Sequence, residues 1–160
     1  MNWLLLVNAL YFLFGATMYV GTMWVLKLFL YPTWHGLSRD NVDTYFGIPT
    51  RAATKFFTAI VPIMFISGGI LVWSEWGTIR LIPAIICLGG IIALTWVGQG
   101  IIIPINVRIR GGDFADDTEL RGLLKRWMTL NDIRFYVSTL TWAAIVWLLV
   151  DRGRLWEAFA

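Results

Sequence analysis

Four long apolar runs, separated by shorter polar segments, dominate the chain. They span about residues 3–31, 56–76, 81–103 and 131–150, and the first holds Lys27 as its only charged residue. A helix needs roughly 20 predominantly apolar residues to cross the hydrocarbon core of a bilayer, where only helices satisfy the backbone of such runs. The pattern predicts an all-α fold, a bundle of four transmembrane helices in one domain covering residues 1–160.

Composition and charge agree with a membrane protein and exclude several other classes. Hydrophobic residues make up 58% of the chain and charged residues 14%, against about 45–50% and 25% in soluble domains. The net charge is +3, and no separate basic stripe with interleaved aromatic residues points to a nucleic-acid partner. The single cysteine, Cys87, excludes an intrachain disulfide and paired-cysteine metal motifs. We therefore expect the lipid bilayer to be the principal environment of this chain.

The distribution of basic residues predicts an orientation. Only three of the 13 Lys and Arg residues flank the outer ends of the runs or the link between the second and third, namely Arg80, Arg152 and Arg154. Cytoplasmic loops carry an excess of Lys and Arg, so the first and third loops should be cytoplasmic and both termini outside. A bacterial inner membrane fits this arrangement.

The segment before the fourth run has the pattern of an amphipathic helix. Asp116 followed by Glu119 resembles a capping box, with Asp in place of Ser or Thr. An apolar face and a basic face then follow at helical spacing: Leu120, Leu123, Leu124, Trp127 and Met128 against Arg121, Lys125 and Arg126. We expect this helix to lie on the cytoplasmic membrane surface and to lead into the fourth span.

A polar stripe enters the fourth span, and a second one ends the third. Helical spacing aligns Trp127, Asn131, Arg134, Ser138 and Thr141, and also Gln99 with Asn106. Polar groups at membrane depth are costly and usually face the bundle interior. The candidate ligand-binding residues are His35, Arg51, Gln99, Asn106, Trp127, Asn131 and Arg134, with Lys55 as an alternative to Arg51. Two interpretations remain open: these groups lock the helices together, or they line a pocket for the polar head of a hydrophobic ligand.

His35 is the only histidine and follows Trp34 in the first loop. One histidine cannot build a bis-histidine haem site or a multi-histidine zinc site, so we predict no metal site and no cofactor. A single axial ligand to haem or to a chlorophyll-type magnesium is the weaker alternative to an interfacial histidine. No nucleophile–base pair or phosphate-binding loop is evident, which leaves catalytic residues unassigned.

Several short motifs in the second half resemble the anthrone-oxygenase-like family of small four-helix membrane proteins. They are Pro104-Ile105-Asn106, then Arg126-Trp127, and Asn131-x-x-Arg134 at the start of the fourth span. The exit Tyr31-Pro32 from the first run is compatible with it. The resemblance implies cofactor-free oxidation of polycyclic aromatic substrates, as associated with named members, and points to Asn106, Trp127, Asn131 and Arg134.

These observations favour a membrane protein that binds a hydrophobic, polar-headed small molecule near the cytoplasmic face, with oxygenase-like chemistry as the extension that the resemblance implies. The alternative is a non-enzymatic accessory subunit of a larger membrane complex, respiratory or photosynthetic. Small size, many aromatic residues and the lack of a self-sufficient catalytic set favour that alternative. A transporter is less well supported, because no inverted repeat is evident.

Overall fold

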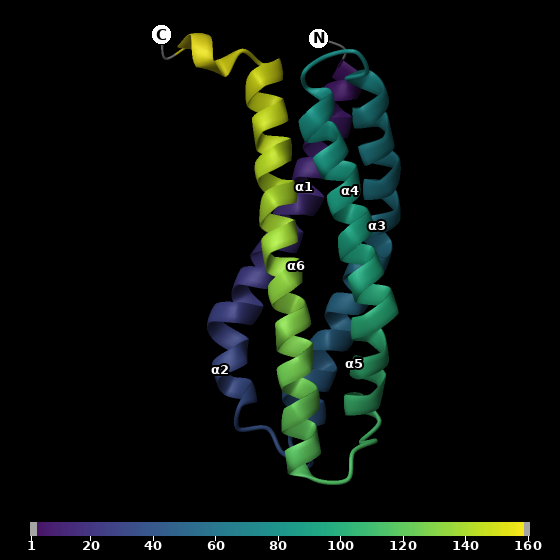
Figure 1. Ribbon diagram of the computed structural model, residues 1–160, viewed down its shortest axis with the longest axis vertical. Coiled ribbons are helices and arrows are strands. Elements are labelled where there is room, and N and C mark those ends of the chain that lie inside the picture. Colours follow the sequence, from purple (N-terminus) through teal and green to yellow (C-terminus); the bar gives the residue numbers. More distant parts are fainter. Residues whose placement is uncertain (1–2, 159–160) are drawn as a thin grey trace.

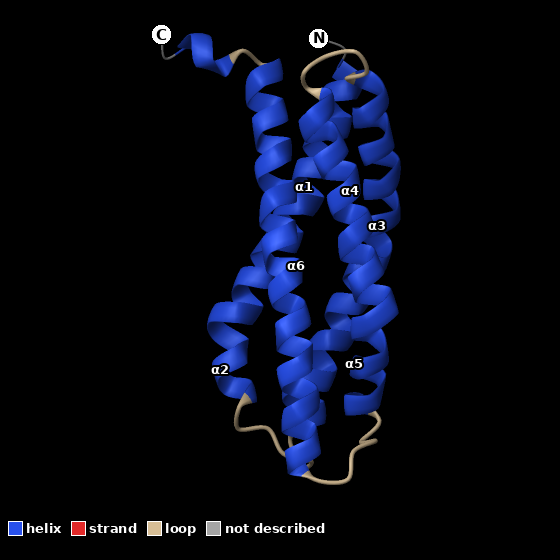
Figure 2. Cartoon of the chain, viewed as in Figure 1, coloured by secondary structure: helices blue, strands red, loops and turns tan. Residues whose placement is uncertain are grey.

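The computed structural model describes residues 3–158, which form a bundle of four long helical rods (Figures 1 and 2). The rods are Trp3–Trp34, Asp43–Ser74, Leu81–Arg110 and Asp117–Arg152, and each is long and apolar enough to cross a membrane. No strand occurs in the described part of the chain. The predicted all-α fold with four membrane-spanning helices is confirmed, and each rod extends beyond its apolar run.

Three of the rods change helical geometry once along their length. The elements in chain order are α1 (Trp3–Val25), η1 (Leu26–Leu30), α2 (Tyr31–Trp34), η2 (Asp43–Gly47), α3 (Ile48–Ser74), α4 (Leu81–Val97), η3 (Gly98–Ile102), α5 (Ile103–Arg110), α6 (Asp117–Arg152) and η4 (Leu155–Ala158). The segments η1, η2 and η3 are wider π turns, and each ends two residues before a proline: Pro32, Pro49 and Pro104. A proline ring clashes with the carbonyl four residues earlier and offers no N–H, so a widened turn accommodates it.

The rods pack as a ring in which α1 contacts α3 and α6, and α4 contacts the same two helices. The short link after Ser74 makes α3 and α4 antiparallel neighbours. Close approach depends on particular glycines: a Cβ at Gly90 would lie 2.0 Å from Thr141 Oγ1, and one at Gly15 would lie 2.5 Å from Met64 Sδ. Small residues therefore let these backbones approach, whereas a Cβ at Gly89 would meet open space.

Both termini lie at one end of the bundle, here called the termini end (Figure 1). At this end, the buried carboxylate of Glu75 in the α3–α4 link forms an ion pair with α6. Glu75, which is 1% exposed, pairs with Arg80 Nε at 2.8 Å and with Arg152 Nη2 at 3.1 Å. The hydrogen bond from Arg80 to Glu75 raises the pKa of Arg80 above its usual value. This cluster was not anticipated from the sequence.

The opposite end, here called the aromatic end, has a core of its own. The rings of Trp34, Phe46 and Trp127 meet edge to face, with centroids 5.1–5.3 Å apart. Leu120 and Leu124 of α6 are buried in the same cluster. The apolar face of residues 117–130 is therefore covered by protein, which corrects the expected position of this segment on the membrane surface.

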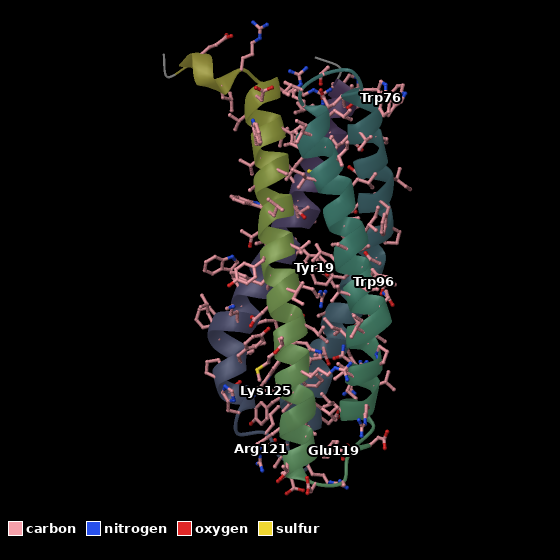
Figure 3. All side chains as sticks on the ribbon, viewed as in Figure 1. Tyr19, Trp76, Trp96, Glu119, Arg121 and Lys125 are labelled. Atoms are coloured by element: carbon pink, nitrogen blue, oxygen red, sulfur yellow. The ribbon has the colours of Figure 1, made fainter. Side chains whose placement is uncertain are left out.

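The start of α6 nevertheless follows the predicted cap. Asp116 Oδ1 accepts hydrogen bonds from the backbone N–H groups of Thr118 and Glu119, both at 2.9 Å. Glu119, at the aromatic end of the bundle (Figure 3), accepts through Oε2 from the backbone N–H of Ala115 at 2.7 Å. The helix then runs without interruption through 36 residues, so the predicted continuation into the fourth span is confirmed.

Candidate ligand-binding cavity

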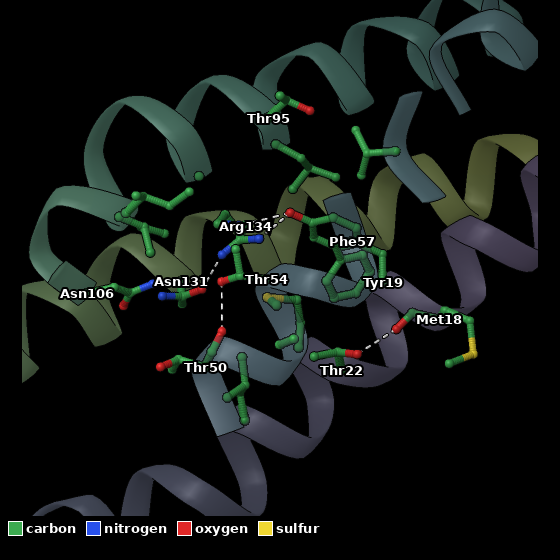
Figure 4. Close-up of a pocket in the computed structure, with 18 of the residues that line it drawn as sticks. Met18, Tyr19, Thr22, Thr50, Thr54, Phe57, Thr95, Asn106, Asn131 and Arg134 are labelled. Carbon is green, nitrogen blue, oxygen red and sulfur yellow. Dashed lines mark hydrogen bonds between the residues drawn. The ribbon is translucent and has the colours of Figure 1, made fainter. Parts of the chain in front are cut away.

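A cavity of about 640 Å³ lies inside the bundle, between α1, α3, α6 and the α4–η3 segment. Its volume falls within the roughly 300–1,000 Å³ typical of small-molecule sites. Apolar side chains form most of the wall, and the indole rings of Trp34 and Trp127 close it toward the aromatic end. Figure 4 shows the polar side chains that face this space from different helices.

The π turns border the cavity. Leu26 and Leu30 of η1 line it, as do Gln99 and Ile102 of η3, and Pro49, another lining residue, is the second residue after η2. A π turn widens the helix locally and shifts the register of the following side chains. Two such turns, η1 and η3, lie on the cavity wall, and η2 ends just before the lining residues Pro49 and Thr50. The proline positions therefore help to explain why this half of the bundle is hollow.

Arg134 of α6 is the only charged residue in the described lining of the cavity (Figure 4). Its Nε and Nη2 both donate to Tyr19 Oη, the former at 3.1 Å, and Nη1 donates to Asn131 Oδ1 at 2.8 Å. Among the described residues, no carboxylate pairs with this guanidinium within 4.0 Å. Arg134 is therefore a cation at membrane depth without a counterion from the described chain, an arrangement that is costly and usually functional.

Two buried amides beside Arg134 are fixed in orientation. The Trp127 indole N–H can only donate, and it donates to Asn106 Oδ1 at 2.6 Å. Asn131 accepts from Arg134 through Oδ1 and donates through Nδ2 to the Trp127 carbonyl at 3.0 Å. These partners leave no freedom to exchange oxygen and nitrogen in either amide. The network therefore holds the guanidinium and the Asn106 amide nitrogen in defined places.

Threonines supply the remaining hydroxyl groups of the wall. Thr50, Thr54 and Thr95 each donate to a carbonyl four residues earlier in their own helix, at 2.7 Å. Their protons are thus used inside the helix, and their oxygens keep lone pairs that can accept. The threonine positions add mild polarity to the cavity without adding charge.

One mouth of the cavity lies between α1 and α3, although Gln99 of η3 is also an exposed lining residue. Lining residues that are also exposed include Met18 and Gly21 on α1, and Thr58 and Pro62 on α3. These positions lie within the apolar spans, and the aromatic cluster closes the adjacent end of the bundle. The cavity therefore opens sideways, toward the hydrocarbon of a surrounding bilayer.

The structure brings together most of the residues predicted for the site and separates two. Gln99, Asn106, Trp127, Asn131 and Arg134 all line the cavity, as the sequence pattern predicted. His35 and Arg51 are absent from the described lining, and both are exposed. The structure places His35 directly after α2 and Arg51 on an exposed face of α3, so neither side chain contributes to this cavity.

Arg51 is engaged elsewhere, in an ion pair with Asp43 in which Nη1 lies 2.9 Å from Oδ1. Lys55, its alternative, is also exposed and outside the described lining. Ser138 and Thr141 continue the polar stripe of α6 but do not line the cavity either. Thr141 is instead buried against Gly90. The stripe therefore lines the cavity at one end and packs against α4 at the other.

Tyr19 is the site residue that the sequence pattern missed. It is 3% exposed, packs against the tilted ring of Phe57 with centroids 4.6 Å apart, and accepts two hydrogen bonds from Arg134. Nothing near it in the sequence forms a polar stripe, and a tyrosine inside an apolar run usually belongs to the core. Only the packing of α1 against α6 places its hydroxyl beside the guanidinium.

Comparisons with protein-family models, curated proteins and solved structures return no match to this chain. The resemblance to the anthrone-oxygenase-like family therefore stays a prediction carried by the short motifs quoted above. Four of their residues, Asn106, Trp127, Asn131 and Arg134, lie on the cavity wall. The assignment of the site rests on that geometry.

Proposed function

We propose that this integral membrane protein binds a hydrophobic, polar-headed small molecule in the cavity beside Arg134. The observation that carries the proposal is the guanidinium without a counterion on the wall of an otherwise mainly apolar space. If the polar groups served only to lock helices, close packing around them would be expected. Instead they border about 640 Å³ of open volume. A ligand with one polar end and an apolar body matches both parts of that wall.

We further propose that the aromatic end faces the cytoplasm of a bacterial inner membrane, with both termini on the other side. Exposed basic side chains at the aromatic end support this orientation, among them Arg39, Arg51, Lys125 and Arg126. At the termini end, Arg80 and Arg152 are paired with Glu75. A reporter enzyme fused to the C-terminus should be active only outside the cytoplasm, and cytoplasmic activity would contradict the orientation.

Oxygenase-like chemistry is a further step that the resemblance suggests. The described lining contains no histidine and no carboxylate, so Tyr19 is the only titratable group there besides Arg134. Any proton transfer during turnover would therefore involve this hydroxyl or the substrate itself. Binding is the part of the function that the cavity geometry supports directly.

A matched pair of substitutions tests the binding proposal. Ala53 lines the cavity, whereas Ala52, its neighbour on α3, is exposed and outside the described lining. The protein and both variants, Ala53→Phe and Ala52→Phe, are purified in a mild detergent, and bound small molecules are identified by mass spectrometry. We expect a stoichiometric amphiphile with the wild type and Ala52→Phe, and its loss with Ala53→Phe.

Equal small-molecule content in the two variants would contradict the proposal. Copurification of stoichiometric protein partners, with no small molecule, would instead favour the accessory-subunit alternative. An absorption spectrum of the same preparation detects a haem or chlorophyll-type pigment directly.

A further inference from the structure

The hydrogen-bonding capacity around Arg134 is unbalanced toward donors. A guanidinium carries five N–H groups, and three of them have acceptors in Tyr19 and Asn131. One N–H on each terminal nitrogen is left without an acceptor among the described residues. Tyr19 accepts twice through Oη, and its own O–H has no acceptor within the described residues either. Three donors therefore converge on one region of the wall.

The side-chain amide of Asn106 adds to this excess of donors. The Asn106 side-chain oxygen accepts from the Trp127 indole N–H. The two hydrogens on Asn106 Nδ2 have no acceptor in the described part of the chain. Because the donor-only indole fixes this amide, the excess does not depend on an arbitrary choice of amide orientation. Such a set of donors is satisfied by a group that only accepts, such as an ionised carboxylate.

Charge points to the same class of ligand. The described cavity wall carries one positive charge and no negative charge. A monoanion would neutralise it, whereas a phosphate monoester, with about −1.5 to −2 charges at neutral pH, would leave a surplus of negative charge at membrane depth. Planar carboxylates also match the fork of N–H groups on a guanidinium.

We propose that the ligand is a carboxylate amphiphile that enters from the bilayer, an inference that rests on the binding function proposed above. Its carboxylate lies against Arg134, Tyr19 and Asn106, and its apolar chain extends along Phe57 and Val61 toward the mouth between α1 and α3. The lateral mouth suits such a molecule, because an amphiphile dissolved in the lipid reaches the cavity without crossing water. Its head then exchanges headgroup hydration for charge-assisted hydrogen bonds.

Equilibrium binding of radiolabelled palmitic acid to the protein in phosphatidylcholine nanodiscs tests this inference, with empty nanodiscs as the blank. Hexadecanol and hexadecyl phosphate serve as competitors with the same chain and a different head. We expect saturable binding of palmitic acid, and competition by hexadecanol at least about tenfold weaker, as the loss of a charge-assisted hydrogen bond implies. Hexadecyl phosphate should also compete less well than unlabelled palmitic acid.

Three variants complete the test. Arg134→Gln should weaken palmitic acid binding about tenfold or more, and Arg134→Lys, which keeps the charge, should recover part of it even if Arg134→Gln folds poorly. Arg51→Gln removes an exposed arginine outside the described lining and should leave binding unchanged.

Each contrary outcome has its own meaning. Equal competition by hexadecanol would overturn the anionic head while leaving the proposed binding function intact. Tighter binding of hexadecyl phosphate would overturn the assignment of a carboxylate. If palmitic acid binds no more to the protein than to empty nanodiscs, the inference is overturned. The proposed binding function is overturned as well only if no amphiphile copurifies with the wild type.

Discussion

Replacing Tyr19 by Phe isolates the hydroxyl that holds Arg134 in place. The change removes one oxygen and keeps the ring, whose centroid lies 5.2 Å from Arg134 Cζ. Two N–H groups of the guanidinium then lose their acceptor, and only the bond to Asn131 remains. A hydrogen bond to a charged group contributes about 1.5–3 kcal/mol. Because both hydrogen bonds end on the same oxygen, we expect Tyr19→Phe to lower the free energy of unfolding by the amount of one such bond, about 1.5–3 kcal/mol.

The measurement is reversible unfolding in mixed micelles of a mild and a denaturing detergent, followed by tryptophan fluorescence. Tyr11→Phe is the matched control: it lies on the same helix and is half-buried, but its hydroxyl donates to the Ile60 carbonyl at 3.5 Å, the limit of a hydrogen bond. We expect the control to change stability by less than about 0.5 kcal/mol, as for substitutions away from strong interactions.

A double-mutant cycle between Tyr19→Phe and Arg134→Gln gives the interaction itself. We expect a coupling free energy of at least about 1 kcal/mol, toward the upper part of the range for polar pairs between membrane helices. Coupling near zero, or an equal effect of Tyr19→Phe and Tyr11→Phe, would refute the reasoning that the Tyr19 hydroxyl positions the guanidinium.

Two further predictions concern the packing that frames the cavity. Gly90→Ala should lower the free energy of unfolding by about 1–3 kcal/mol, because its Cβ would lie 2.0 Å from Thr141 Oγ1. Gly89→Ala, whose Cβ would meet open space, should have no such cost. Equal stabilities of the two variants in the same unfolding assay would contradict this packing. Glu75→Gln should lower the free energy of unfolding by about 3–5 kcal/mol, because it leaves the half-buried Arg152 without its ion pair. A thermal unfolding midpoint equal to that of the wild type would show that the buried cluster contributes no net stability.

The sequence by itself determined the number and type of the spanning elements. Apolar runs of this length have one solution in lipid, because each backbone polar group must be paired within its own helix. The start of α6 was also predictable, since the Asp116 cap depends only on residues within one turn. Helical spacing placed Asn131 and Arg134 on one face with Trp127, and all three line the cavity.

Only the tertiary structure decided what surrounds that face. Tyr19 and Arg134 are 115 positions apart in the chain, and no local pattern marks them as partners. His35 was a candidate from the first loop, but the structure places it directly after α2 on the exposed surface, outside the cavity. The cavity itself depends on how the four rods, three of them with a π turn, pack against one another. Local spacing fixes which residues share a helix face, whereas the packing of separate helices fixes which faces meet and where space remains between them.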